Sequence, residues 1–179
     1  MGLLEQLTDG ELVRRVIDGD ELAFRALYRR HGHMLQGVIR RLLGGQTNDL
    51  EDILQETWLA ACRAMRTYRG DARFSTWLIA IGVRIARRRL QLVDGRGEIN
   101  DAVYDAGVQS NLTTRLDLER SLERLTDSQR AVLVLHDAQG FTHEEIGTLL
   151  GMPPGTSRSL LTRGRRAIRK LLSMDVSYD

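Results

Sequence analysis

The chain has 179 residues, enough for one domain or two small ones, and its net charge of +2 is close to neutral. No apolar run approaches the roughly 20 residues that span a bilayer, and no signal-peptide pattern opens the chain. A single cysteine, Cys62, excludes an internal disulfide and a cysteine-based zinc cluster. We therefore expect a soluble cytoplasmic protein with no membrane insertion.

The first half of the chain is predicted to be helical. Thr8 and Glu11 have the spacing of a capping box, in which each residue satisfies a backbone N–H of the other. Apolar residues then recur at helical spacing as far as Leu42. The segments Asp18-Gly19-Asp20 and Gly44-Gly45 are expected to break this stretch into separate helices.

The next predicted helix begins at Asn48, its expected N-cap, and runs to about Met65. Its apolar stripe is expected to be buried and consists of Leu50, Leu54, Trp58, Ala61, Cys62 and Met65. A cysteine on such a stripe is expected to be an inert structural thiol. The opposite, acidic side carries Asp49, Asp52 and Glu56, flanked by Gln55. Acidic side chains suit a basic protein partner better than DNA, although an ordinary solvated face has the same pattern.

A further helix is predicted from Ser75, as N-cap, to about Leu92. One of its faces and the loop before it combine aromatic residues with arginines: Arg73, Phe74, Trp77, Arg84, Arg87 and Arg88. Aromatic rings can stack on unpaired bases while arginines hold the nucleic-acid backbone. Either of the two aromatic residues could equally belong to the core.

Helical periodicity fails over residues 94–111, where glycines recur and acidic residues dominate. We interpret this segment as a flexible acidic linker between domains formed by residues 1–93 and 112–179. The predicted fold class is all-α, with two small helical domains.

The last quarter of the chain has the organisation of a helix-turn-helix. Thr126 and Thr142 each begin a capping box, and a turn around Gly151 leads into a final helix. That helix has no acidic residue between Arg158 and Lys170. The second helix of a helix-turn-helix enters the major groove of DNA, so this helix is the candidate reader.

The final helix has an apolar side that is expected to pack inward, formed by Leu160, Leu161, Ala167, Ile168 and Leu171. Its start and its other side supply the candidate DNA contacts: Thr156, Ser157, Arg158, Ser159, Thr162, Arg163, Arg165 and Arg166. Residues at the helix start meet base edges, and arginines bind bases or phosphates. The alternative is a solvated basic face on an ordinary terminal helix.

No arrangement of residues typical of a catalytic or metal site was found. The four histidines lack the spacing of metal ligands, and no glycine-rich phosphate loop is present. We therefore predict no enzyme activity, no cofactor and no metal.

Three segments, in this order, resemble the extracytoplasmic-function (ECF) sigma factors of bacterial RNA polymerase. They are Asp49-Leu-Glu-Asp-Ile-Leu-Gln-Glu-Thr-Trp58, Phe74-Ser-Thr-Trp-Leu78 and the helix-turn-helix with Gly155-Thr156. The resemblance extends from about Leu12 to Leu172. It implies that residues 1–93 are sigma region 2 and that residues 112–179 are sigma region 4.

The resemblance also implies partners for each surface. Asp49, Asp52, Gln55 and Glu56 would dock on the β′ coiled coil of core RNA polymerase, with the β subunit as a further contact. The arginines and aromatics from Arg73 to Arg88 would capture the single-stranded −10 promoter element. The residues from Thr156 to Arg166 would read the duplex −35 element. The linker would lie in the RNA exit path, and an anti-sigma factor would hold the protein inactive.

Some positions differ from the usual pattern of the family. Arg84 stands where Asn is frequent, and Ala80 where a basic residue is frequent. Ser157 replaces the usual Val, and Leu160 the usual Arg. These differences leave the promoter sequence open.

Two other functions fit parts of the sequence. A stand-alone helix-turn-helix regulator would bind duplex DNA tightly without polymerase, through paired half-sites. A helical adaptor would use its basic face to bind acidic proteins, and competing DNA would not displace them.

Overall fold

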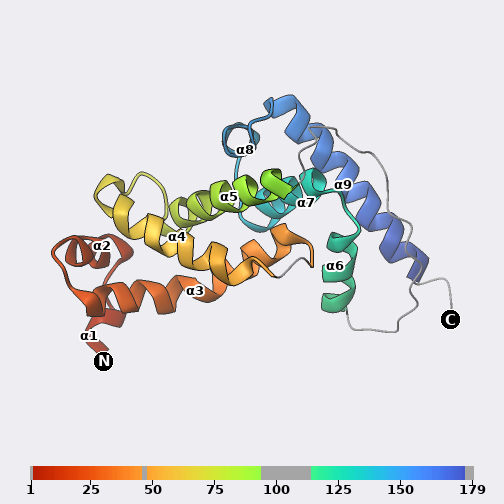
Figure 1. Ribbon diagram of the computed structural model, residues 1–179. Coiled ribbons are helices and arrows are strands. Elements are labelled where there is room, and N and C mark those ends of the chain that lie inside the picture. Colours follow the sequence, from red (N-terminus) through yellow and green to blue (C-terminus); the bar gives the residue numbers. More distant parts are fainter. Residues whose placement is uncertain (1, 46–47, 94–113, 176–179) are drawn as a thin grey trace. The chain divides into compact units, whose positions relative to one another are not determined.

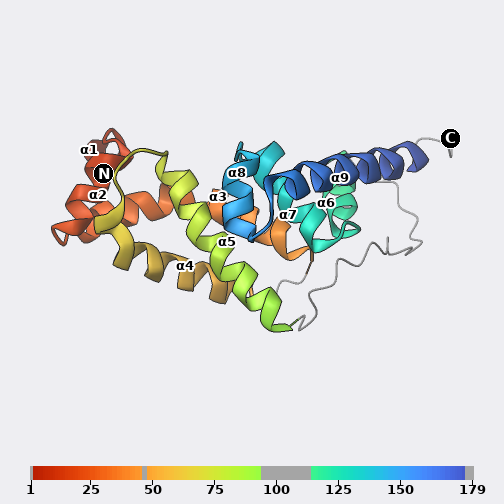
Figure 2. The same cartoon turned by 90° about the horizontal axis from the view of Figure 1, so that it is seen from above.

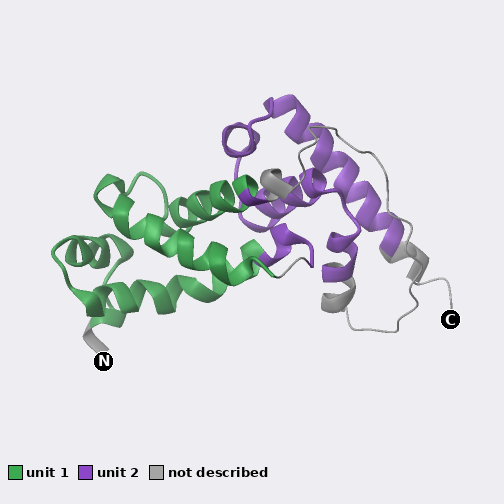
Figure 3. Cartoon of the chain, viewed as in Figure 1, with its two compact units in different colours: residues 1–39, 48–88 green, residues 40–47, 89–179 purple. Residues whose placement is uncertain are grey.

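The computed structural model describes residues 2–45, 48–93 and 114–175, and every element within these ranges is helical. This confirms the all-α prediction. None of the described helices is both long and apolar enough to cross a membrane. The chain divides into two compact units, one formed by residues 1–39 and 48–88 and the other by residues 40–47 and 89–179 (Figure 3).

The first unit is built mainly from three long helices with shorter helices before and between them (Figure 1). In chain order these are α1 (Gly2–Glu5), α2 (Asp9–Ile17), α3 (Glu21–Leu43), α4 (Leu50–Ala64), the 3-10 turn η1 (Met65–Thr67) and α5 (Phe74–Val93). The last residues of α3 and α5 belong to the second unit.

The starts of two of these helices were predicted from local sequence, one of them correctly. The predicted capping box of α2 is present, because Glu11 accepts a bond from the Thr8 N–H at 2.7 Å and Thr8 accepts one from the Glu11 N–H at 3.3 Å. The prediction for α5 was wrong by two residues. Its Trp77 N–H bonds to the carbonyl of Arg73 at 3.1 Å, so the helix begins at Phe74 and Ser75 lies inside it.

The core of the first unit lies where α3, α4 and α5 cross. Its fully buried side chains include Leu27, Leu35, Ile39, Ile53, Met65, Phe74, Leu78 and Ile79. Gly82 allows a close approach, because a Cβ atom there would lie 3.0 Å from Cδ1 of Ile39 and 3.3 Å from Oγ1 of Thr57. The three helices are therefore packed too closely at this point for a larger residue.

The buried stripe of α4 differs from the predicted one. Trp58, Ala61 and Met65 are buried as expected, but Ile53 and Thr57 complete the stripe and Cys62 is exposed. Thr57 tolerates burial because its hydroxyl donates to the carbonyl of Ile53 in the same helix at 2.6 Å. The predicted stripe left out this polar residue and included the cysteine instead.

The second unit contains the helix-turn-helix. Its elements are α6 (Thr114–Glu123), α7 (Asp127–Leu133), the π-helical turn η2 (Val134–Ala138), α8 (His143–Leu150) and α9 (Pro154–Asp175). The long helix α9 packs against α6, α7 and α8, as the view from above shows (Figure 2). The capping boxes at Thr126 and Thr142 are both present. The predicted linker, residues 94–111, lies outside the described residues, and the domain boundaries drawn around it remain predictions.

The turn between α8 and α9 depends on two glycines. Gly151 ends α8 in the left-handed conformation, with φ of 67°, which glycine adopts without a steric penalty. The Met152 N–H then bonds to the carbonyl of Gly147 at 3.0 Å. A Cβ atom on Gly147 would lie only 2.7 Å from the backbone oxygen of Met152, so this position cannot carry a side chain without moving the turn.

Candidate protein and nucleic-acid interfaces

The predicted acidic face of α4, formed by Asp49, Asp52, Gln55 and Glu56, lies on the outer side of the helix. The first three residues are exposed and Glu56 is half-buried. Leu59 lies one turn beyond Glu56 and is 59% exposed. Acidic groups bordering an exposed leucine offer a basic protein partner both ion pairs and apolar contact area.

The basic surface of α5 contains most of the residues predicted to bind single-stranded DNA. Arg73, Arg84 and Arg88 are exposed, and Trp77 and Arg87 are half-buried. Phe74 differs from these because only 1% of its surface is exposed. The structure therefore places the Phe74 ring in the core, where it supports the surface from beneath.

An aromatic cluster surrounds Phe74. Its ring centroid lies 5.6 Å from that of Tyr68, 5.4 Å from that of Trp77 and 5.1 Å from that of His31. The Tyr68 hydroxyl donates to the carbonyl of Ala72 at 2.8 Å and so closes the loop that precedes α5. Burial raises the pKa of Tyr68, and the negative charge of Asp9 adds to this effect, which keeps the hydroxyl protonated as a donor.

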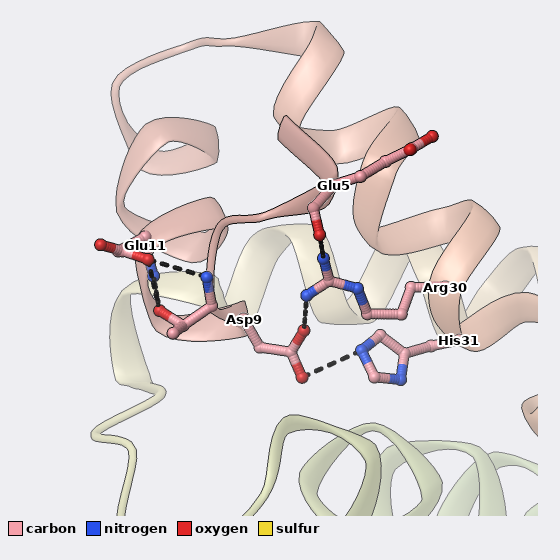
Figure 4. Close-up of polar contacts among 6 residues, drawn as sticks. Glu5, Asp9, Glu11, Arg30 and His31 are labelled. Atoms are coloured by element: carbon pink, nitrogen blue, oxygen red, sulfur yellow. Dashed lines mark hydrogen bonds and ion pairs between the residues drawn. The ribbon is translucent and has the colours of Figure 1, made fainter. Parts of the chain in front are cut away.

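Neither Tyr68 nor the polar contacts around His31 (Figure 4) were predicted from the sequence. Asp9 accepts a bond from Nη1 of Arg30 at 2.7 Å and contacts Nε2 of His31 at 3.0 Å. Arg30 also donates to the carbonyl of Glu5 at 3.1 Å. These contacts attach α1 and α2 to α3 and hold the buried imidazole of His31 against Phe74. An aspartate in a capping box gives no sequence signal for a partner 21 residues away.

The two predicted sites of the first unit adjoin one another. Arg88 of α5, predicted to bind DNA, donates to the Glu56 carboxylate of α4, which was predicted to bind a protein. The Arg88 side chain is 64% exposed and that of Glu56 is 35% exposed, so the pair lies at the surface. A partner that binds Glu56 therefore competes directly with Arg88.

The basic face of α9 is largely as predicted. The exposed residues are Arg158, Ser159, Thr162, Arg163, Arg165 and Arg166, with Thr156 half-buried at the helix start. Leu160, Leu161 and Ile168 are buried on the opposite side. Ser157 is fully buried, and its hydroxyl lies 2.9 Å from Nδ1 of His143 on α8. Its side chain therefore joins the two helices and does not reach the surface.

Two carboxylates of the same unit hold arginines of α9. Asp137, in η2, accepts bonds from Nε and Nη2 of Arg165 at 2.9 Å and 2.6 Å, which is a bidentate contact. Glu144 of α8 lies 3.6 Å from Nη1 of Arg158. The hydrogen bond from Arg165 lowers the pKa of Asp137 and correspondingly raises that of Arg165.

A pair of histidines borders the Arg165–Asp137 contact. Nδ1 of His136 lies 2.9 Å from Asp137, and its ring stacks on His143 with centroids 4.6 Å apart. Desolvation lowers the pKa of His143, and repulsion from His136 and Arg158 lowers it further. Both effects favour the neutral imidazole of His143 beside the serine that it contacts. None of these contacts was predicted from the sequence.

Comparison with known proteins finds a matching family for each half of the chain. The sequence model of the family described as "Sigma-70 region 2" matches residues 27–92, and that described as "Sigma-70, region 4" matches residues 115–168. The chain is 33% identical to the ECF RNA polymerase sigma-E factor of Escherichia coli K12, over 92% of this chain and 94% of that protein. It is 31% identical to the protein of the same name from Haemophilus influenzae, over 93% and 96% of the two chains.

Solved structures with similar folds include two complexes. CnrH, solved with the cytosolic domain of CnrY, has a TM-score of 0.61 and 25% identity over 93% of this chain and 98% of its own. The sigma factor RpoE of Bartonella quintana, solved with the anti-sigma factor NepR, has a TM-score of 0.59 and 22% identity over 85% and 98%.

Proposed function

This chain belongs to the extracytoplasmic-function sigma factors of bacterial RNA polymerase, and from that premise we propose which surface performs each step of promoter-specific initiation. The acidic face of α4 binds core polymerase, the basic surface of α5 binds the −10 element, and α9 binds the −35 element. The observation that supports this best is the outward position of the acidic face within the segment that matches sigma region 2.

The acidic face carries the contact with core polymerase. Asp49, Asp52, Gln55 and Glu56 dock on the β′ coiled coil, and the exposed side chain of Leu59 supplies apolar contact area at the edge of the patch. The charge complementarity between an acidic helix and a basic partner also speeds association.

The basic surface of α5 captures the non-template strand of the −10 element. Trp77 stacks on an unpaired base, at about 1–3 kcal/mol for each base stack, and Arg73, Arg84, Arg87 and Arg88 hold the backbone. Phe74 acts from the core, through its contacts with Trp77 and Tyr68. The stacking energy offsets part of the cost of extruding a base from the duplex.

Helix α9 reads the −35 element in the major groove. Thr156, Arg158 and Ser159 lie at its start, where base edges are met. Thr162, Arg163, Arg165 and Arg166 follow along the basic face and meet phosphates. Ser157 supports this arrangement through α8.

The protein performs no catalytic step itself, and it acts in the cytoplasm where the polymerase is. An anti-sigma factor holds it inactive by covering the acidic face and the basic surfaces. The complex of CnrH with the cytosolic domain of CnrY supports the part of the proposal that a protein partner binds this chain.

Transcription of fragmented genomic DNA by core polymerase tests the proposal, with and without this protein and with the 5′ ends sequenced. New start sites that share two spaced upstream elements are the expected result. Their absence, with core active on another sigma factor and this protein folded, would instead favour a stand-alone regulator.

Removal of the acidic face tests the assigned contact. Asp52→Ala combined with Glu56→Ala is expected to abolish core binding while leaving the helical circular dichroism spectrum unchanged. Asp18→Ala combined with Glu21→Ala is the matched control, because it removes the same charge from exposed positions elsewhere in the unit. Undiminished core binding by the first variant would refute the assignment.

A further inference from the structure

We infer that Asp137, and more weakly Glu144, are built-in counter-ions of the DNA-contacting arginines of α9 and lower the affinity of the protein for duplex DNA. The inference rests on the proposed function of α9. It assigns a role in DNA binding to two acidic residues outside the predicted binding surface.

The geometry of the Arg165–Asp137 contact supports this role. Both oxygens of the carboxylate are used, at 2.9 Å and 2.6 Å, by the Nε and Nη2 groups of one guanidinium. A phosphate can use the same donors for its own bidentate contact. A phosphate that approaches Arg165 must therefore displace Asp137 or bind through the remaining donors, beside a negative charge.

The counter-ion also changes the salt dependence of binding. Each arginine or lysine that contacts a DNA phosphate releases a condensed salt ion from the DNA, and this release favours binding. The slope of log K against log salt therefore reports how many such side chains contact phosphates. An arginine already neutralised by its own carboxylate contributes less than a full contact. Asp137 is therefore expected to reduce both the affinity and the slope.

The contact persists across the physiological pH range. Arg165 lowers the pKa of Asp137, so the carboxylate remains charged. The other titratable groups around it are His136 of η2, His143 and Glu144 of α8, and Arg158 of α9. Nδ1 of His136 donates to the same Asp137 oxygen that accepts from Nη2 of Arg165, which further fixes the carboxylate in place.

Glu144 provides a weaker case in the same unit. Its carboxylate is 3.6 Å from Arg158, beyond hydrogen-bond distance, and its side chain is 70% exposed against 31% for Asp137. Solvent screens such a pair more effectively. Its effect on DNA binding is therefore expected to be smaller than that of Asp137.

Fluorescence anisotropy of the full-length protein with a labelled duplex of random sequence, at several salt concentrations, tests the inference. Asp137→Asn is expected to bind about two- to fivefold more tightly at low salt, since exposed ion pairs are of that strength. Its salt slope should increase by up to about one. Asp137→Glu keeps the charge and is expected to bind duplex DNA nearly as tightly as the natural protein does. This control separates the effect of the lost charge from any effect of the substitution on folding.

A double-mutant cycle separates the specific contact from general charge. Asp137→Asn in an Arg165→Ala background should gain no more affinity than Glu123→Gln, which neutralises an exposed carboxylate of α6. A gain that persists without Arg165 would overturn the inference. So would weaker binding by Asp137→Asn, which would mean that the carboxylate orients Arg165 for DNA. If neither Arg158→Ala nor Arg165→Ala affects duplex binding, the proposed function of α9 fails instead.

Discussion

The Arg88–Glu56 pair of the first unit and the Arg165–Asp137 pair of the second are locally alike but differ in what else their carboxylates bind. Each joins an arginine assigned to DNA with an acidic residue of a neighbouring element. Glu56 is itself a proposed contact for core polymerase, whereas Asp137 has no assigned external partner. Polymerase binding is therefore expected to release Arg88 for DNA, while Arg165 stays held until DNA competes.

The two pairs also differ in how they are held in place. Glu56 and Arg88 lie on two long helices that cross in the core of the first unit. The second pair depends on the positions of η2 and α9, and so on the tight turn that places α9 after α8. Exposed ion pairs contribute only about 0–1 kcal/mol, so both can open when a partner binds.

The largest effect is expected at this turn. Gly147→Ala places a Cβ atom 2.7 Å from the Met152 oxygen and should destabilise the second unit by about 2 kcal/mol. Gly155→Ala is the control, because a Cβ atom there meets nothing within 4 Å. Only Gly147→Ala should have a lower melting temperature and a lower affinity for duplex DNA. Core binding through α4 should be retained. Equal melting of the two variants would contradict this account of the turn.

Core binding distinguishes the two carboxylates directly. Glu56→Gln should weaken binding to core polymerase about tenfold, or 1.4 kcal/mol, because it removes one charged contact. Asp137→Asn should leave that affinity unchanged. Titration of labelled protein with core polymerase measures both, and equal losses would show that the two pairs are not functionally different.

A smaller effect is expected from pH in the second unit. Because the pKa of His143 is lowered from its ordinary value of 6.5, the unfolded chain takes up this proton at higher pH than the folded chain does. Stability should therefore fall as the pH drops below about 6.5. The melting temperature measured against pH should show this fall, and His143→Asn, which can keep the bond to Ser157, should reduce it. An unchanged slope in that variant would exclude His143 as the cause.

Much of the fold follows from local sequence. The three capping boxes, at Thr8, Thr126 and Thr142, were predicted and are present, because a cap needs only residues three positions apart. The outward acidic side of α4 and the basic side of α9 also followed from helical periodicity. The inferred roles of these surfaces come from the family resemblance, and their individual residues remain to be tested.

Only the tertiary structure decided which residues of mixed character are buried. Thr57, Phe74 and Ser157 are inside and Cys62 is outside, although their spacing permitted other arrangements. The two ion pairs join residues 32 and 28 positions apart, far beyond the reach of any contact within one helix. Periodicity determined which side of each helix is apolar, because that property repeats every few residues. It could not determine which arginine meets which carboxylate, because such pairs form only where helices pack.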